Sequence, residues 1–177
     1  AKKKDFFFIQ IGANDGVKAD PIRKHVLRNG WSGLLVEPQP DVFRALKNNY
    51  RKQKGLIFEN VAIADRNGTI DFYVSTKDGL SSLYPDEWFK GKNRNDAYMN
   101  RLSAGGSKRI RVKATTFDSL LNKHKIRQLD MLQIDTEGYD YEILKQLDFT
   151  MIKPKMIRFE KHHLSSKQKR QSKTFLR

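Results

Sequence analysis

Cysteine is absent from the 177 residues of the sequence. Its absence excludes disulfide bonds, thiolate nucleophiles and cysteine-ligated zinc, and it is compatible with a reducing compartment. Long hydrophobic runs are also missing, because the apolar stretch FFFIQI near the N-terminus is too short to cross a membrane and leads directly into glycines. We therefore expect a soluble, cytoplasmic protein without a membrane span, folded as a single domain over residues 1–177.

Acidic residues are scarce relative to basic ones. The chain has 35 Lys and Arg residues against 20 Asp and Glu residues, which gives a formal net charge of +15. This excess favours an anionic partner such as nucleic acid. The alternative is a solvated surface, since much of the charge lies in residues 2–4, 94–113 and 161–177 without an accompanying nucleic-acid-binding motif. Both interpretations of the charge stay open.

Short apolar runs of strand length alternate with segments of helical periodicity. This alternation predicts an α/β fold with a mostly parallel sheet and helices on both faces. The strands are expected at residues 6–11, 33–36, 56–61, 69–74, 110–114, 131–134 and 156–160. The helices are expected at residues 20–29, 40–50, 116–123 and 139–147.

Two segments lack this regular pattern. Residues 75–108 are rich in glycine, serine and asparagine but also contain aromatic residues, which is typical of a lid or substrate loop. Ser81 and Ser82 lie in this segment, and we expect them to contact a substrate rather than form a plain turn. Residues 164–177 are polar and basic, and they are expected to form a terminal helix or tail.

A glycine-containing turn follows the first predicted strand in FFFIQIGANDG, and the next strand ends on Glu37. Glycines allow a ligand to approach the backbone, and an acid at the end of the second strand can accept ribose hydroxyls. However, GANDG does not match the GxGxxG pattern that holds a pyrophosphate. A nucleoside without phosphates therefore fits better than a dinucleotide.

Seven motifs, taken in order, resemble the FkbM family of S-adenosylmethionine-dependent methyltransferases. They are FIQIGANDG, LLVEPQP, ENVAIAD, GLSSL, TTFDSLL, LDMLQIDTEGYDYEIL and IRFEKHH, and the resemblance extends from residue 6 to about residue 163. It implies a Rossmann-like class I methyltransferase fold and S-adenosyl-L-methionine as cofactor. Family members continue into a final antiparallel hairpin, so we expect that hairpin to be missing here.

The resemblance also assigns roles to individual residues. It implies that the cofactor's methionine part lies against the turn after the first strand, that Glu37 binds the ribose hydroxyls, and that the adenine lies near the ends of the second and third strands. The implied cofactor-binding residues are Gln10, Gly12, Ala13, Asn14, Gly16, Glu37, Pro38, Asn60, Val61, Ala62 and Asp135.

Gln10 departs from the family pattern, because many methyltransferases have an acidic residue two positions before the first glycine. An amide cannot supply the charge that complements the cofactor's ammonium group. Asp135 or Asp15 is expected to supply it instead.

Methylation of an aliphatic hydroxyl requires removal of a proton. His162 and His163, which follow the last predicted strand, have a suitable unperturbed pKa, although adjacent histidines in a basic segment are often only solvated. Asp135 and Glu137 are expected to position the acceptor, or to act as the base or as metal ligands. Glu160 is left open between a substrate contact and pairing with lysines. The spacing of these residues matches no compact ligand motif, so no metal site is predicted.

The expected function is O-methylation of a hydroxyl on a sugar, a glycan or a small metabolite. The alternative is a basic nucleic-acid-binding protein, or an RNA methyltransferase, on the same scaffold. Neither the acceptor nor the oligomeric state can be read from these residues.

Overall fold

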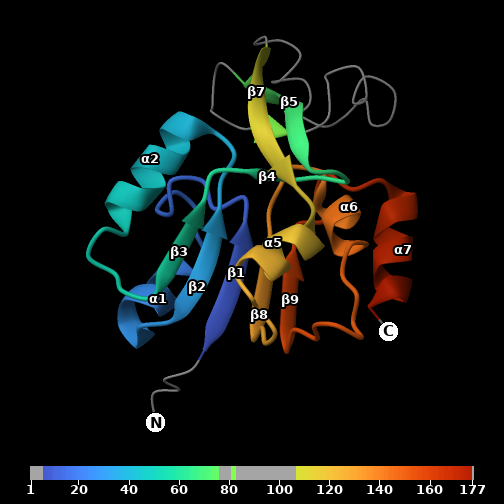
Figure 1. Cartoon of the computed structure of the whole chain (residues 1–177). Coiled ribbons are helices and arrows are strands. Elements are labelled where there is room, and N and C mark those ends of the chain that lie inside the picture. The colour runs from blue at the N-terminus through green and yellow to red at the C-terminus, as the bar shows by residue number, and fades with distance from the viewer. Residues whose placement is uncertain (1–5, 76–80, 83–106, 177) are drawn as a thin grey trace.

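The computed structural model describes residues 6–75, 81–82 and 107–176. Its main sheet has five parallel strands in the order β3-β2-β1-β8-β9, with β1 in the middle (Figure 1). These strands are β1 (Phe7–Ile11), β2 (Ser32–Val36), β3 (Leu56–Glu59), β8 (Met131–Ile134) and β9 (Met156–Phe159). The central strands are almost entirely buried, which explains their largely apolar sequences.

Helices cover both faces of this sheet. On one face, α1 (Arg23–Asn29) and α2 (Pro40–Asn49) bury Val26 and Leu46 against Phe8 and Leu35. The other face is covered by α5 (Phe117–Lys123), α6 (Asp140–Leu144) and α7 (Ser166–Phe175), whose apolar residues share a second cluster with Ile9, Leu132 and Ile134. The predicted α/β class, with a mostly parallel sheet and helices on both faces, is confirmed.

Helix ends follow local signals in the sequence. Gly30 ends α1 in the left-handed conformation, with φ of 65°. Pro40 occupies the first turn of α2, where its missing N–H costs nothing. The side chain of Thr116 caps α5, and Ser165 with Gln168 forms a reciprocal capping box at α7. The basic terminal segment, for which helix and tail were both open, therefore forms a helix.

A second, four-stranded sheet is the main feature that the sequence did not reveal. It has the order β4-β7-β5-β6 and comprises β4 (Ala62–Ile63), β5 (Gly68–Ser75), β6 (Ser81–Ser82) and β7 (Ser107–Thr115). The third strand was expected to run to residue 61 but ends at Glu59, and β4 begins three residues later. Figure 1 shows β4, β5 and β7 beyond the carboxyl ends of the main sheet, on the side where a ligand would bind.

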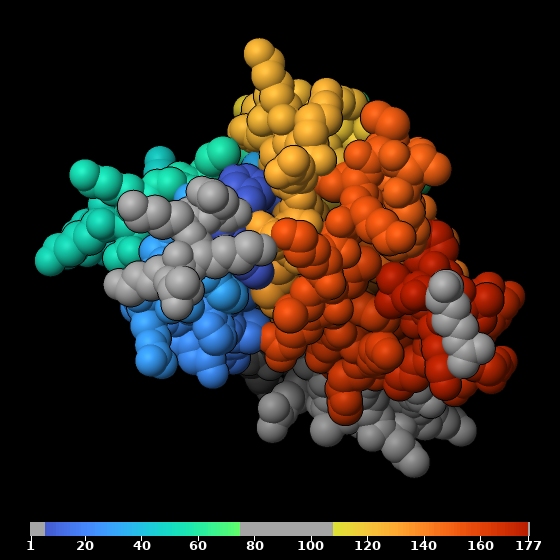
Figure 2. Space-filling view, turned by 90° about the horizontal axis from the view of Figure 1, so that it is seen from below, coloured from blue at the N-terminus to red at the C-terminus, as the bar shows by residue number. Residues whose placement is uncertain are grey.

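The first and last parts of the chain occupy different halves of the molecule. Figure 2 shows the blue to teal residues on one side and the orange to red residues on the other. Most of the predicted lid, residues 75–108, lies outside the described residues. No helix in the described ranges has the length and apolar character needed to cross a membrane.

Candidate active site

A pocket opens at the carboxyl ends of β1, β2 and β8. At β1 the order of the strands changes, because β2 and β3 lie to one side of it and β8 and β9 to the other. In open α/β sheets this switch point is the usual ligand site. Its lining contains many of the predicted cofactor-binding residues together with both predicted catalytic carboxylates. The predicted residues on the lining are Gln10, Gly12, Ala13, Asn14, Glu37, Pro38, Val61, Ala62, Asp135 and Glu137.

The turn after β1 brings backbone groups to this pocket. The N–H groups of Gly12 and Ala13 both donate to the carbonyl of Val36, at distances of 3.0 Å. Gly12 has φ of 77°, and a Cβ added there would lie 1.8 Å from the carbonyl oxygen of Asp135. Asn14 also adopts a left-handed conformation, with φ of 50°, which asparagine tolerates better than most residues. The turn therefore needs glycine at position 12 but accepts Asn14 where many methyltransferases have another glycine.

Glu37 is almost completely buried, with 4% of its surface exposed. Its Oε2 accepts a hydrogen bond from the N–H of Asn14 at 3.0 Å, and its Oε1 accepts one from the N–H of Gln39 at 2.9 Å. Burial raises its pKa to about 7, although these two backbone hydrogen bonds oppose the shift. The carboxyl group is thus fixed at the pocket wall, and each oxygen retains lone pairs for further donors.

The raised pKa of Glu37 predicts that the ligand-free protein loses stability as pH rises from 4.5 to about 7. In that range the unfolded state releases a proton that the folded state still holds. The contribution of Glu37 to the free energy of unfolding is therefore full below pH 4.5 and lost above pH 7. Compared with Glu37→Gln, which does not titrate, the wild-type protein should lose roughly 3 kcal/mol of unfolding free energy between pH 4.5 and pH 8. Urea unfolding of both proteins at several pH values measures this difference. A constant difference across the range would contradict the prediction.

Gln10 is buried beside the turn, with 3% of its surface exposed. Its Nε2 donates to Oδ1 of Asp20 at 3.1 Å, and this bond leaves Oε1 without a hydrogen-bond partner among the described residues. Asp20 is itself fixed, because its Oδ1 also accepts the N–H of Ile22 and its Oδ2 accepts the hydroxyl of Tyr50. Gln10 and Asp20 both line the pocket. A buried acceptor without a partner is costly unless a ligand supplies a donor.

Asp20 was not among the predicted residues, and Asp135 or Asp15 was expected to supply negative charge to a ligand. The carboxylate of Asp15 instead accepts the N–H groups of Val17 and Lys18 at 2.8 Å. Asp20 lies five residues further on, just after the left-handed Ala19. A possible signal in the sequence was its place before Pro21 and the first helix, which is typical of a capping residue.

Two predicted cofactor-binding residues are not on the described lining of the pocket and have structural contacts. The Nδ2 of Asn60 donates to the carbonyls of Glu37 and Pro38, at 2.8 and 3.0 Å, which holds the end of β2 against the end of β3. A Cβ on Gly16 would lie 2.4 Å from the ring of Tyr50 and 2.7 Å from Leu46. Gly16 thus permits close packing of the turn on α2.

The loop after β8 carries Asp135 and Glu137 and is organised by Asp140. Asp140 is fully buried, and its Oδ2 accepts hydrogen bonds from the N–H and hydroxyl of Thr136 and from the N–H of Gly138. Its Oδ1 accepts the N–H of Glu160, which ties the loop to the end of β9. Sequence reasoning did not identify Asp140, although an acid in the first turn of α6 was visible.

Burial and neighbouring charges raise the pKa of two carboxyl groups here, those of Asp135 and Glu160. Burial raises the pKa of Asp135 to about 6, with further contributions from the charges of Glu137 and Asp140. Burial and the charge of Glu137 likewise raise the pKa of Glu160 to about 7, while His163 opposes the shift. These carboxyl groups therefore form one concentrated region of negative charge beside the pocket.

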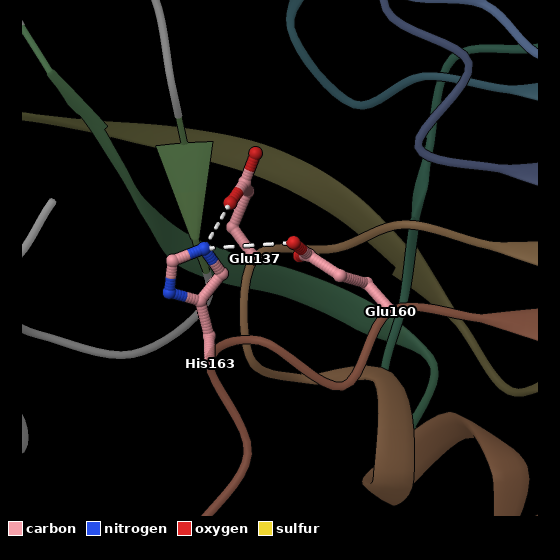
Figure 3. Close-up of side chains that lie close together, drawn as sticks. All are labelled: Glu137, Glu160 and His163. Atoms are coloured by element: carbon pink, nitrogen blue, oxygen red, sulfur yellow. Dashed lines mark ion pairs between the residues drawn. The ribbon is translucent and has the colours of Figure 1, made fainter.

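His163 lies at the centre of this acidic region. Its Nε2 is 3.1 Å from Oε2 of Glu137 and 3.7 Å from Oε1 of Glu160, and Figure 3 shows the imidazole facing both carboxylates. Only 7% of the His163 side chain is exposed. His162 is exposed on the same turn and packs edge-on against His163, with 4.9 Å between the ring centroids. The structure thus brings His163, but not His162, to the carboxylates.

The predicted substrate residues Ser81 and Ser82 form β6, at the edge of the second sheet. Ser82 pairs with Tyr73 and Ser81 with Val74 in antiparallel register. Their role as substrate contacts stays a prediction.

A family model, the methyltransferase FkbM domain, matches residues 10–177. The chain belongs to the FkbM methyltransferase domain family. This match confirms the resemblance drawn from the seven motifs, and the parallel sheet with its order β3-β2-β1-β8-β9 confirms the Rossmann-like fold.

This FkbM domain is also similar to a curated protein, the 2-O-methyltransferase NoeI of Sinorhizobium fredii (strain NBRC 101917 / NGR234). The two are 28% identical over 161 residues, which cover 88% of this chain. The matched region is 63% of the relative, so the FkbM domain described here spans less than two thirds of that protein's length. No solved structure matches the chain significantly.

Proposed function

We propose that this FkbM domain is an S-adenosyl-L-methionine-dependent O-methyltransferase whose acceptor is a hydroxyl of a sugar, a glycan or a small metabolite. The observation that carries the proposal is the pocket at the switch point. Its lining has the buried carboxyl of Glu37 and the amide oxygen of Gln10, which has no hydrogen-bond partner among the described residues. Family membership and the similarity to a 2-O-methyltransferase support the reaction type.

The polar groups of the pocket fit the chemistry of this cofactor. Glu37 would accept both ribose hydroxyls through the lone pairs that its two backbone hydrogen bonds leave available. Pro38, Val61 and Ala62 offer an apolar surface for the adenine. The left-handed turn at Gly12 allows the ligand to approach the backbone closely. The cofactor, when bound, supplies a methyl group on a sulfonium.

Gln10 and Asp20 would recognise the cofactor's ammonium group together. The bond from Gln10 to Asp20 orients the amide so that its oxygen is the group left to accept a donor. Asp20 supplies the negative charge that an amide lacks, and it lies on the same pocket lining. This pair would replace the acidic residue that many methyltransferases have where Gln10 stands here, with Asp20, rather than Asp135 or Asp15, providing the charge.

Asp135 and Glu137 are the members of the predicted catalytic set on the described pocket lining. An acceptor hydroxyl placed next to them would donate a hydrogen bond to a carboxylate oxygen, and this contact would orient its oxygen for in-line attack. Asp140 would act as a positioning residue, since its hydrogen bonds fix the loop from Thr136 to Gly138.

Calorimetric titration tests the proposed cofactor. The protein should bind S-adenosylmethionine and its demethylated product with one site each, and it should bind methylthioadenosine, which lacks the amino acid part, more weakly. Gln10→Ala should reduce affinity for S-adenosylmethionine about tenfold and leave affinity for methylthioadenosine unchanged, because one hydrogen bond to a charged group is worth roughly 1.5 kcal/mol. An intact fold with no affinity for either cofactor form would refute the proposed function.

One structural observation supports the alternative function, nucleic-acid binding. Arg109, Arg111 and Lys113 are exposed at alternate positions of β7. Binding to unrelated DNA and RNA across a salt series tests it. A steep salt dependence together with no cofactor affinity would favour that reading.

A further inference from the structure

Glu137, Glu160 and His163 form a compact cluster of metal-ligating side chains that no sequence motif indicated. Each can offer one ligand atom, and the three atoms lie within 4.8 Å of one another. Figure 3 shows that the imidazole and both carboxylates converge on one point although the loops after β8 and β9 supply them. Residues 23 positions apart in the sequence thus meet only because β8 and β9 are neighbours in the sheet.

The backbone holds these three residues in place. Glu137 adopts a left-handed conformation, with φ of 54°, which is uncommon for a residue with a long side chain. The N–H of Glu160 donates to Asp140, and only 7% of the His163 side chain is exposed. A left-handed conformation like that of Glu137 costs free energy, and strained backbone of this kind is concentrated at functional sites in proteins.

The cluster carries more negative than positive charge. Asp135 and Asp140 are close enough to raise the pKa of Glu160 through their charges, in addition to Glu137. His163 is the one ion-pair partner of Glu160 within the described ranges, and the Oε2 of Glu160 is buried there without a hydrogen-bond partner. The lysine pairing that the sequence left open for Glu160 is thus not seen in the described part of the chain.

We propose that Glu137, Glu160 and His163 bind a divalent cation of the Mn²⁺ and Mg²⁺ class. Two carboxylate oxygens and one imidazole nitrogen form a mixed donor set in which oxygen predominates, which suits these cations better than thiolate-preferring ones. Ligand atoms around such an ion lie about 3 to 4 Å apart. The 3.1 and 3.7 Å separations from the imidazole nitrogen already lie in this range.

The position of the site suggests what the cation does. Glu137 also lines the cofactor pocket, so a cation bound to it would lie at the pocket's edge. Three protein ligands leave coordination positions open to water or to an acceptor oxygen. A bound hydroxyl would be held near the methyl donor and would lose its proton more easily. This role rests on the proposed function, whereas cation binding itself does not.

Titration of the full chain with Mn²⁺ tests the site. The electron paramagnetic resonance signal of free Mn²⁺ should report one bound ion per chain. Glu160→Gln and His163→Gln should each weaken binding at least tenfold, because a neutral amide replaces a charged carboxylate or an imidazole nitrogen. Glu142→Gln serves as the matched control, since Glu142 lies on α6 and pairs with Lys145 outside the cluster. This control should leave affinity unchanged.

A spectroscopic measurement separates a ligand from a structural residue. Spin-echo modulation from the imidazole nitrogen should be present on bound Mn²⁺ in the wild type and in the Glu142→Gln variant, and absent in His163→Gln. The proposal is overturned if the wild type binds no stoichiometric Mn²⁺, or if binding and modulation persist in His163→Gln. Calorimetry with S-adenosylmethionine in metal-free buffer, on the same samples, shows independently whether the proposed function holds.

Discussion

Replacement of Glu37 by alanine should weaken binding of S-adenosylmethionine more than a hundredfold. The side chain is buried at the pocket wall and would accept both ribose hydroxyls, so its removal loses two charge-assisted hydrogen bonds worth roughly 3 kcal/mol together. Calorimetry at pH 8 is the appropriate measurement, because the carboxyl group, whose pKa is about 7 without ligand, is then largely ionised.

Two controls make this result specific. Asp41→Ala removes an exposed carboxylate from α2, four residues away, and should leave affinity unchanged. Thermal unfolding of Glu37→Ala shows whether the loss of its bonds to Asn14 and Gln39 has disrupted the turn. A folded Glu37→Ala protein whose affinity falls less than threefold would mean that Glu37 does not bind the ribose.

Gly12→Ala should have the largest effect on stability. The new Cβ would lie 1.8 Å from the carbonyl oxygen of Asp135, which belongs to the backbone and cannot rotate away. The φ of 77° at position 12 adds the cost of holding alanine in a left-handed conformation. We expect a loss of roughly 3 kcal/mol or more in the free energy of unfolding, measured by urea denaturation.

Gly30→Ala is the matched control for this prediction. Gly30 has a similar φ of 65°, but no atom lies within 4 Å of the position that a Cβ would take. Gly30→Ala should therefore lower the free energy of unfolding by only about 1 kcal/mol, from the left-handed backbone alone. If both variants lost the same amount, close packing of the turn on the loop after β8 would not be the reason for glycine at position 12.

The sequence predicted the elements of the main sheet because each has a clear local signal. The run from Phe7 to Ile11 is apolar apart from Gln10 and is followed by a glycine, and Gly30 and Pro40 mark helix ends. The place of Glu37 on the pocket lining was also predictable, since it lies at the end of β2. These inferences needed only neighbouring residues.

Other features depended on contacts that local patterns do not encode. With two residues, β4 is too short to show periodicity, and its partner β7 begins 44 residues after β4 ends. Asp20 reaches the pocket through the turn at Ala19, and Glu160 reaches Glu137 through the pairing of β8 with β9. The acidic cluster and the Gln10 to Asp20 contact therefore became visible only in three dimensions.

The pairing of β1 with β8 also bears on how the chain acquires its pocket during synthesis. The N–H of Phe7 donates to the side chain of Asp130, 123 residues later, and the turn at Gly12 rests on Asp135. Contacts between such distant residues form slowly because the intervening loop must close first. A nascent chain lacking β8 would have β1 and β2 but would lack the part of the pocket lining that Asp135, Thr136 and Glu137 form. Ligand-dependent protection from proteolysis should consequently arise late in translation, after residue 135 has left the ribosome.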